Sequence, residues 1–81
     1  MKLPRDLGGE ELAHSLAKFG YQITRQTGSH LRLTAIAPQE HHVSIPRHKP
    51  IKVGTLNSIL NEIAQHLNID KHELLKRLFA D

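Results

Sequence analysis

The sequence predicts an α+β domain in which three antiparallel strands form one sheet and two main helices cover one face of it. Three observations carry this prediction. Apolar residues recur at helical spacing before Tyr21, alternate with polar residues from Tyr21 to Pro46, and return to helical spacing from Leu56 onward. Turn-forming residues separate the alternating segments, so consecutive strands are expected to pair as neighbours. The expected order is helix, three strands, helix and a short terminal helix.

The first helix is expected over residues Glu10–Phe19. Leu12, Leu16 and Phe19 follow one another at spacings of four and three, which places them on one side of a helix. Gly20 directly follows and is a natural C-terminal stop, because glycine adopts the left-handed conformation that commonly ends a helix. The boundaries of this helix are therefore well marked.

Three strands are expected over residues 21–26, 30–37 and 41–46, with turns at residues 27–29 and 38–40. Successive side chains of a strand point to opposite faces, so each strand divides into an inner and an outer set. The inner set, beneath the helices, comprises Tyr21, Ile23, Leu31, Leu33, Val43 and Ile45. The outer set, facing solvent, comprises Gln22, Thr24, Gln26, His30, Arg32, Thr34, His42 and Ser44.

An exposed loop over Arg47–Val53 is expected to lead into a second helix that begins at Gly54 and Thr55 and that Asn68 can end. Asp70, followed three residues later by Glu73, resembles a capping box that opens a short third helix. The apolar stripe of the second helix comprises Leu56, Ile59, Leu60, Ile63, Ala64 and Leu67.

Length and composition limit the classes of protein. With 81 residues, the chain is expected to form a single domain over residues 1–81, because shorter pieces could not each bury a core. The absence of cysteine excludes disulfides and thiolate zinc sites. No apolar run is long enough for a signal core after Met1–Gly9, or for a membrane span. We expect a cytoplasmic protein that acts without a membrane.

Positive charge gathers in the middle of the chain. The sequence carries 11 Lys and Arg against 8 Asp and Glu, for a formal net charge of +3. Between residues 25 and 52, Glu40 is the only acidic residue, and four histidines are interspersed among the basic ones. This distribution permits a polyanionic partner such as RNA. The basic residues of this segment are Arg25, Arg32, Arg47, Lys49 and Lys52.

His30 is the candidate catalytic residue. It follows the turn Gly28–Ser29 at the first position of a strand, and Arg32 lies on the same outer face. Histidine accepts and returns protons near neutral pH, and RNA supplies its own nucleophile in the 2′-hydroxyl group. A neighbouring cation stabilises the charge that develops on the phosphate. On spacing alone, however, a solvent-facing histidine on a strand is more often only a polar surface residue than a catalytic one.

A second candidate site lies where the basic loop meets the second helix. The free backbone N–H groups at a helix N-terminus and nearby basic side chains suit a phosphate group. The equally weighted alternative is that Gly54 and Thr55 only cap the helix while the lysines are solvated. The residues in question are Arg47, Lys49, Lys52, Gly54 and Thr55.

Neither a metal site nor a small-molecule cofactor is expected. His41, His42 and His48 could suggest a metal site, but His41 and His42 are adjacent on a strand and should point to opposite faces, and no thiolate or close carboxylate cluster assists them. The glycine-rich motifs that cradle nucleotide phosphates are absent from the sequence.

Four segments together carry a family resemblance: Lys-Phe-Gly-Tyr at 18–21, Arg-Gln-Thr-Gly-Ser-His at 25–30, Ile-Pro-Arg-His at 45–48 and Gly-Thr-Leu-Asn-Ser-Ile-Leu at 54–60. In this order and spacing, the chain resembles the HicA toxin family of prokaryotic toxin–antitoxin pairs over nearly its whole length. The resemblance implies a fold related to double-stranded RNA-binding domains, ribosome-independent cleavage of messenger RNA, and inhibition by a HicB-type antitoxin protein.

The resemblance also implies roles for individual residues. The histidine of the Gly-Ser-His motif, His30, would be catalytic, and His48 would contact RNA or the partner. The hypothesis is therefore a metal-independent endoribonuclease with His30 as general base or acid. Two alternatives remain: a non-catalytic RNA-binding module, and a structural subunit that docks a protein through the open sheet face. The expected RNA-binding residues are Ser29, Arg32, Arg47, His48, Lys49, Lys52, Gly54 and Thr55.

Overall fold

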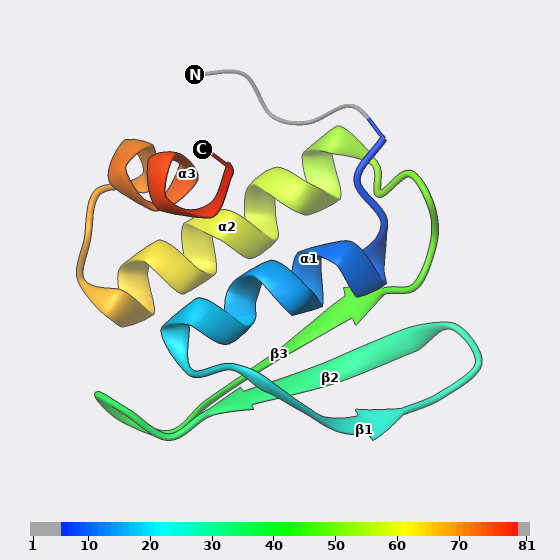
Figure 1. The fold of residues 1–81 in the computed structure, drawn as a ribbon, viewed down its shortest axis with the longest axis horizontal. Helices are drawn as coiled ribbons and strands as arrows, with labels where there is room; N and C mark the ends of the chain where they lie inside the picture. Colours follow the sequence, from blue (N-terminus) through cyan, green and yellow to red (C-terminus); the bar gives the residue numbers. More distant parts are fainter. Residues whose placement is uncertain (1–5, 80–81) are drawn as a thin grey trace.

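The computed structural model describes residues 6–79 and shows the predicted order of elements (Figure 1). The segment Met1–Arg5, part of the stretch on which the argument against a signal segment rests, lies outside the described residues, as do residues 80–81. The elements are α1 (Gly9–Leu16), the 3₁₀ helix η1 (Ala17–Phe19), β1 (Gln22–Gln26), β2 (His30–Ala35), β3 (His41–Pro46), α2 (Val53–Leu67) and α3 (Lys71–Phe79).

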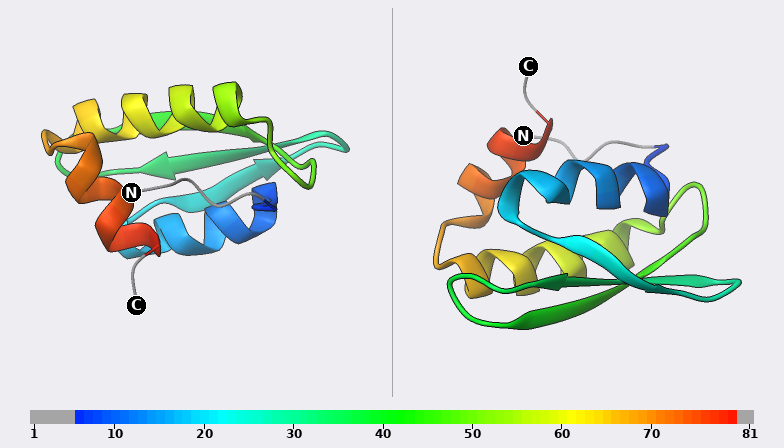
Figure 2. Two further views of the ribbon diagram at one scale, coloured as in Figure 1. Left: turned by 90° about the horizontal axis from the view of Figure 1, so that it is seen from above. Right: turned by 60° about the horizontal axis from the view of Figure 1, so that its bottom comes forward.

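The three strands form one antiparallel sheet in the order β1-β2-β3. Helices α1 and α2 lie side by side on one face of this sheet and leave the other face open (Figures 1 and 2). Leu33 of β2, Leu12 of α1 and Leu60 of α2 are completely buried between the two layers. This confirms the predicted α+β arrangement, in which apolar burial on one side of the sheet supplies most of the stability.

Strand β1 contains an irregularity that the alternating pattern did not predict. Ile23 pairs with Leu33, but the register then shifts so that Arg25 pairs with Arg32 and Gln26 with Leu31. One extra residue in β1 produces this shift, as in a β-bulge. Arg25 therefore lies on the open face beside Arg32. The prediction that Gln26 belongs to the outer set was wrong, because beyond the bulge Gln26 lies opposite an inner residue.

Ile23 is the other correction to the inner set. It keeps the predicted face, opposite Leu33, but its side chain is 43% exposed rather than buried. β1 is an edge strand, and Ile23 lines a hollow between β1 and α1, so one side of it remains in solvent. The other predicted inner residues are all buried, namely Tyr21, Leu31, Leu33, Val43 and Ile45.

The segment between β3 and α2 differs from the exposed loop that the sequence predicted. Ile51 is 3% exposed and belongs to the core, and its N–H group donates to the Leu7 carbonyl at 2.8 Å. Helix α2 begins one residue before Gly54 and has Lys52 at its N-cap. A lone apolar residue in a loop has no periodicity, so its burial could not be recognised from the pattern.

The ends of the helices follow the predicted stop signals. Gly20 adopts a φ of 86° after η1, and Asn68 adopts a φ of 56° after α2. Helix α3 packs its leucines against the core, and the Asp70 carboxylate accepts the His72 N–H group at 3.0 Å. Glu73 pairs with Arg77 at 2.8 Å instead of completing the predicted capping box. Among residues 6–79, no helix combines the length and apolar character needed to cross a bilayer.

Candidate active site

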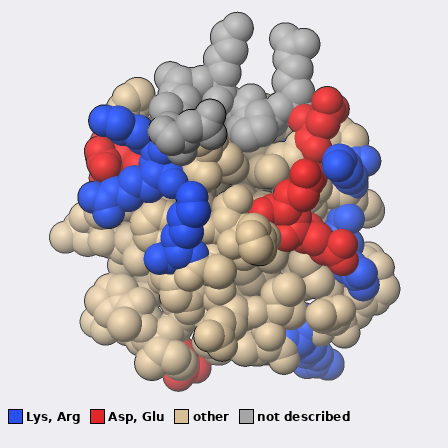
Figure 3. All heavy atoms as spheres, in the orientation of Figure 1, with Lys and Arg blue, Asp and Glu red and all other residues tan. Residues whose placement is uncertain are grey.

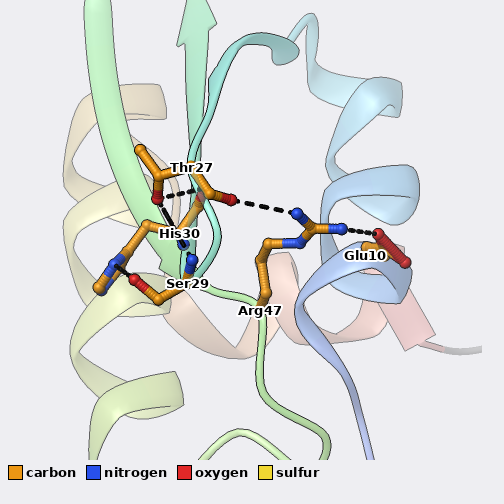
Figure 4. A network of polar contacts seen from close by, with 5 residues as sticks. All are labelled: Glu10, Thr27, Ser29, His30 and Arg47. Atoms are coloured by element: carbon orange, nitrogen blue, oxygen red, sulfur yellow. Dashed lines mark hydrogen bonds and ion pairs between the residues drawn. The ribbon is translucent and has the colours of Figure 1, made fainter.

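Side chains close the turn that carries His30 (Figure 4). The Thr27 N–H group donates to the His30 carbonyl at 2.9 Å, as expected for a hairpin. The return bond from the His30 N–H group goes to the Thr27 hydroxyl, also at 2.9 Å. The Thr27 carbonyl instead accepts a hydrogen bond from Arg47 Nη1 at 3.1 Å. Three bonds therefore fix the backbone at the position from which the His30 side chain projects.

Arg47 joins this turn to the rest of the molecule. Its Nη2 atom lies 3.0 Å from Glu10 Oε2 on α1, and its backbone N–H group donates to the Ser29 carbonyl at 2.9 Å. In Figure 4 the Arg47 guanidinium and the His30 ring point to opposite sides of the turn. Arg47 thus contacts the hairpin and α1, and does not contact the imidazole.

The His30 ring is exposed and is oriented by its neighbour. Nδ1 lies 3.0 Å from Ser29 Oγ, and among the described residues Nε2 has no hydrogen-bond partner. A hydroxyl group can donate or accept, so Ser29 is compatible with a proton on either ring nitrogen. The free Nε2 atom can consequently take up or release a proton toward a ligand at the surface.

A hollow of about 300 Å³ on the open face surrounds His30 and is lined by Arg25, Thr27, His30, Arg32 and Ser44. The bulge in β1 places Arg25 opposite Arg32, and Ser44 faces Arg32 from β3. Within residues 6–79, neither Arg25 nor Arg32 forms an ion pair with a carboxylate. Two uncompensated guanidinium groups beside an imidazole make this hollow suitable for a phosphate group.

The basic loop beyond β3 has a different electrostatic environment. Lys49 Nζ lies 3.3 Å from Glu11 Oε1, and together with Arg47 it lines a separate small hollow that also contains Glu10. The Gly8 N–H group, followed by Lys49, lowers the pKa of Glu11. Figure 3, which views the molecule as in Figure 1, shows acidic and basic groups next to one another on the right of the molecule. Glu10 and Glu11 of α1 thus compensate the positive charges of Arg47 and Lys49.

The remaining predicted residues lie at the start of α2 or just before it. Lys52, Gly54 and Thr55 are exposed there, and none of them lines the hollow around His30. The His48 side chain is exposed, while its carbonyl accepts the Gly9 N–H group at 3.2 Å. The structure therefore brings together His30, Ser29 and Arg32, and it leaves the loop residues as a second, separate group.

Three residues at the hollow were missed by the sequence analysis. Arg25 was placed in neither the inner nor the outer set, and only its position in the basic segment suggested a role. Thr27 was treated as part of a turn, and Ser44 as one polar residue of an outer set. The cross-strand register that joins Arg25, Arg32 and Ser44 depends on the bulge, for which the sequence contains no signal.

The other two strand histidines are engaged elsewhere and, as predicted, lie on opposite faces. His41 contacts the Tyr21 hydroxyl at 2.7 Å and Glu62 at 3.0 Å, beneath the helices. His42, on the open face, contacts Thr34 and Glu40 at 2.8 Å each. His42 pairs with Thr34, four residues along β2 from His30 and therefore about 14 Å away. His30 and His42 are too far apart to act on one phosphate.

The fold and the hollow define a class of protein. A three-stranded sheet with two helices on one face is the layout of double-stranded RNA-binding domains, and here the open face carries a cationic pocket around a histidine. Such a combination marks a small α+β domain whose open sheet face has a hollow suited to a phosphate group.

The family can be stated more closely. A family model described as the HicA toxin of bacterial toxin–antitoxin systems matches residues 9–65, which include α1, the whole sheet and most of α2. The chain belongs to the HicA toxin family, and its role is that of a toxin in a toxin–antitoxin system. No curated protein and no solved structure is significantly similar to it.

Proposed function

We propose that this toxin is a metal-independent endoribonuclease that cuts messenger RNA without the ribosome, with His30 as its proton-transfer residue. The observation that carries the proposal is the placement of the exposed His30 ring in one hollow with two guanidinium groups, Arg25 and Arg32, that have no carboxylate partner within residues 6–79. Membership in a family of RNA-cleaving toxins supports the same conclusion.

The reaction would use the RNA as its own nucleophile. Nε2 of His30 accepts the proton of a 2′-hydroxyl group, and the freed oxygen attacks the adjacent phosphorus. The bond from phosphorus to the 5′-oxygen of the next nucleotide breaks, and that oxygen takes a proton from the imidazolium or from water. The products are a 2′,3′-cyclic phosphate and a 5′-hydroxyl end. Arg25 and Arg32 would stabilise the negative charge that builds up on the phosphoryl oxygens.

The other predicted residues would act outside this hollow. Ser29 holds the His30 ring through Nδ1, so it would orient the imidazole as well as approach the RNA. The contacts of Arg47 favour a positioning role through the turn. Exposed groups on the loop and at the first turn of α2 would bind flanking phosphates, namely His48, Lys49, Lys52, Gly54 and Thr55. A HicB-type antitoxin would inhibit the toxin.

The test is cleavage of end-labelled RNA by purified variants. His30→Ala should reduce the rate by about 10³-fold or more, because proton transfer and orientation are lost together. His42→Ala is the matched control, since His42 is an exposed histidine of the same sheet face but lies outside the hollow. Arg25→Ala should reduce cleavage about 10²-fold, as expected for loss of a group that stabilises transition-state charge. DNA should be inert, and a chelator should leave the rate unchanged.

Three results would count against the proposal, and the second of them would favour the non-catalytic alternative. If His30→Ala, with an unchanged circular dichroism spectrum, cuts RNA as fast as the wild type, His30 is not catalytic. If the wild type binds RNA in a salt-dependent manner but never cuts it, the chain is an RNA-binding module. Products with a 3′-hydroxyl end would exclude attack by the 2′-oxygen.

A further inference from the structure

A second hollow lies on the open sheet face, beyond the one around His30. It has a volume of about 320 Å³ and sits where the end of η1 meets β1 and the end of β2. Phe19, which is partly buried, and Ile36, which is 73% exposed, supply large apolar groups to it. The full lining comprises Phe19, Gly20, Gln22, Thr24, Thr34, Ile36 and Ala37.

The two hollows are neighbours along the same two strands. Thr34 follows Arg32 by two residues on β2, so both side chains point to the open face. On β1, Thr24 of the second hollow directly precedes Arg25 of the first. A strand of RNA that runs along β1 and β2 from the cationic hollow would pass over the second one.

The chemistry of the second hollow differs from that of the first. Its lining contains no charged residue, so it supplies no positive charge to a phosphate. Gln22 supplies an amide group to this hollow, and the hydroxyl groups of Thr24 and Thr34 lie 2.9 Å apart in its lining. Apolar walls with a few hydrogen-bonding groups suit a flat heteroaromatic ring that presents donors and acceptors at its edge.

We propose that this hollow is a subsite for one unstacked nucleobase of the RNA strand whose phosphate lies at His30. This inference rests on the proposed function and adds a determinant of substrate choice to it. Ile36 and Phe19 would make apolar contacts with the ring of the base, and the Gln22 amide would form hydrogen bonds with its edge. Phe19 is one of only three aromatic residues in the chain, so the surface accommodates a single base rather than a stacked run.

Continuity with the cationic hollow favours RNA as the occupant over a protein side chain. Arg25 and Arg32 lie next to the subsite and complement the charge of a nucleic acid backbone. A buried apolar anchor of a protein partner would lie beside two unpaired guanidinium groups, which are costly to desolvate. A protein occupant is therefore the competing outcome of the test.

The test is a binding cycle with RNA that cannot be cut. Short 2′-fluoro oligonucleotides lack the nucleophilic hydroxyl group, and a set is prepared in which each base in turn is replaced by an abasic site. In the wild type, one abasic position should weaken binding about fivefold by fluorescence anisotropy. Ile36→Ala should weaken binding of the intact oligonucleotide by a similar factor, and in that variant the abasic penalty at the same position should disappear.

Val53→Ala is the matched control, because Val53 is a 63% exposed apolar residue at the start of α2, outside both hollows. This variant should retain the abasic penalty. Additive effects of Ile36→Ala and every abasic site would overturn the subsite, while His30-dependent cleavage by the wild type would leave the nuclease proposal standing. Absence of RNA binding by the wild type would end both proposals. Loss of antitoxin binding in Ile36→Ala, with RNA binding unchanged, would assign the hollow to a protein interface.

Discussion

At the tip of the β1–β2 hairpin, a threonine hydroxyl takes the place of a backbone carbonyl. Thr27 Oγ1 accepts the His30 N–H group at 2.9 Å, which leaves the Thr27 carbonyl free for Arg47. The direction of the His30 side chain thus depends on two side chains that need not touch the reacting atoms. Residues that act in this way are expected to affect turnover more than substrate binding.

Thr27→Val should lower kcat about tenfold with little change in KM, because the valine keeps the shape of the side chain but leaves the His30 N–H group without its acceptor. Thr27→Ser retains a hydroxyl and should restore most of the activity. Steady-state cleavage of a short fluorescent RNA measures both constants. A Thr27→Val enzyme with normal kcat would show that the turn holds His30 without this bond.

Sequence reasoning recognised some residues of the site and not others, for physical reasons. His30 and Arg32 were predicted on one face because alternation along β2 is unbroken, and the structure keeps both there. Arg25 was not selected, because a bulge reverses the face of every residue that follows it. Arg47 and Lys49 were predicted as RNA-binding residues, but their ion pairs were not predicted, because Glu10 and Glu11 come close to them only after α1 has folded onto the loop.

Helix α1 approaches the end of β3 so closely that its first residue must be small. A Cβ atom added to Gly9 would lie 2.1 Å from the Pro46 carbonyl oxygen and 3.0 Å from the Arg47 Cα atom. Both neighbours are backbone and cannot move aside individually. This contact sets the distance between α1 and the segment that carries Arg47.

Gly9→Ala should therefore destabilise the fold by about 2 kcal/mol or more, since α1 must shift away from β3. Gly54→Ala is the matched control: it lies in the first turn of α2 with open space around its Cα, and it should stabilise the protein by about 0.5–1 kcal/mol. Urea denaturation followed by circular dichroism measures both. Equal stabilities of the two variants would contradict the close contact.

The elements differ in how far their sequence patterns determine them. Helix α2 was predicted to within one residue of its start and to its end, because its apolar stripe is long and Asn68 stops it. β3 was predicted in full, since it pairs with β2 without irregularity. β2 ends two residues earlier than predicted, at Ala35, which leaves Ile36 in solvent. Short apolar runs do not reveal where pairing stops.

At the scale of the whole molecule, one polar cluster joins the start of the sheet, its last strand and the second helix. Tyr21 contacts His41, which contacts Glu62 and stacks on His66 with ring centroids 4.4 Å apart. Burial, followed by the charge of Glu62, raises the pKa of Tyr21 to about 12. Burial, followed by the neighbouring His41, lowers the pKa of His66. Both shifts link the folding equilibrium to pH.

The free energy of unfolding should fall at alkaline pH, because ionisation of the Tyr21 phenol favours the unfolded chain. In the unfolded state the phenol ionises near 10, whereas in the folded state its pKa is about 12. The stabilising contribution is thus complete below pH 10 and is lost between these values, by an amount on the order of 2 kcal/mol. Because the chain contains a single tyrosine, tyrosinate absorbance reports this residue alone.

Tyr21→Phe is the control variant for this measurement. This variant lacks the titrating phenol, so the fall in stability that Tyr21 causes between pH 10 and 12 should be absent from its urea denaturation. At neutral pH, loss of the hydrogen bond to His41 should cost about 1 kcal/mol. Appearance of tyrosinate near pH 10 in the folded wild type would show that the phenol is accessible to water.

The arrangement of the whole molecule was the most predictable level. A change of period from helix to strand and back fixes the layers, and the inner residues of three short strands leave only one face for the helices to cover. What the sequence could not show is which polar groups meet, because that depends on register and on loops such as the one anchored by Ile51.

Along β2, Leu31, Leu33 and Ala35 are buried while His30, Arg32 and Thr34 share the solvent-facing side. Selection for folding therefore acts on every second position, and the intervening positions can drift almost without penalty to the scaffold. Substitutions at the outward positions can therefore change what this surface binds without disturbing the interior. Libraries randomised only at the outward positions should yield folded proteins at high frequency.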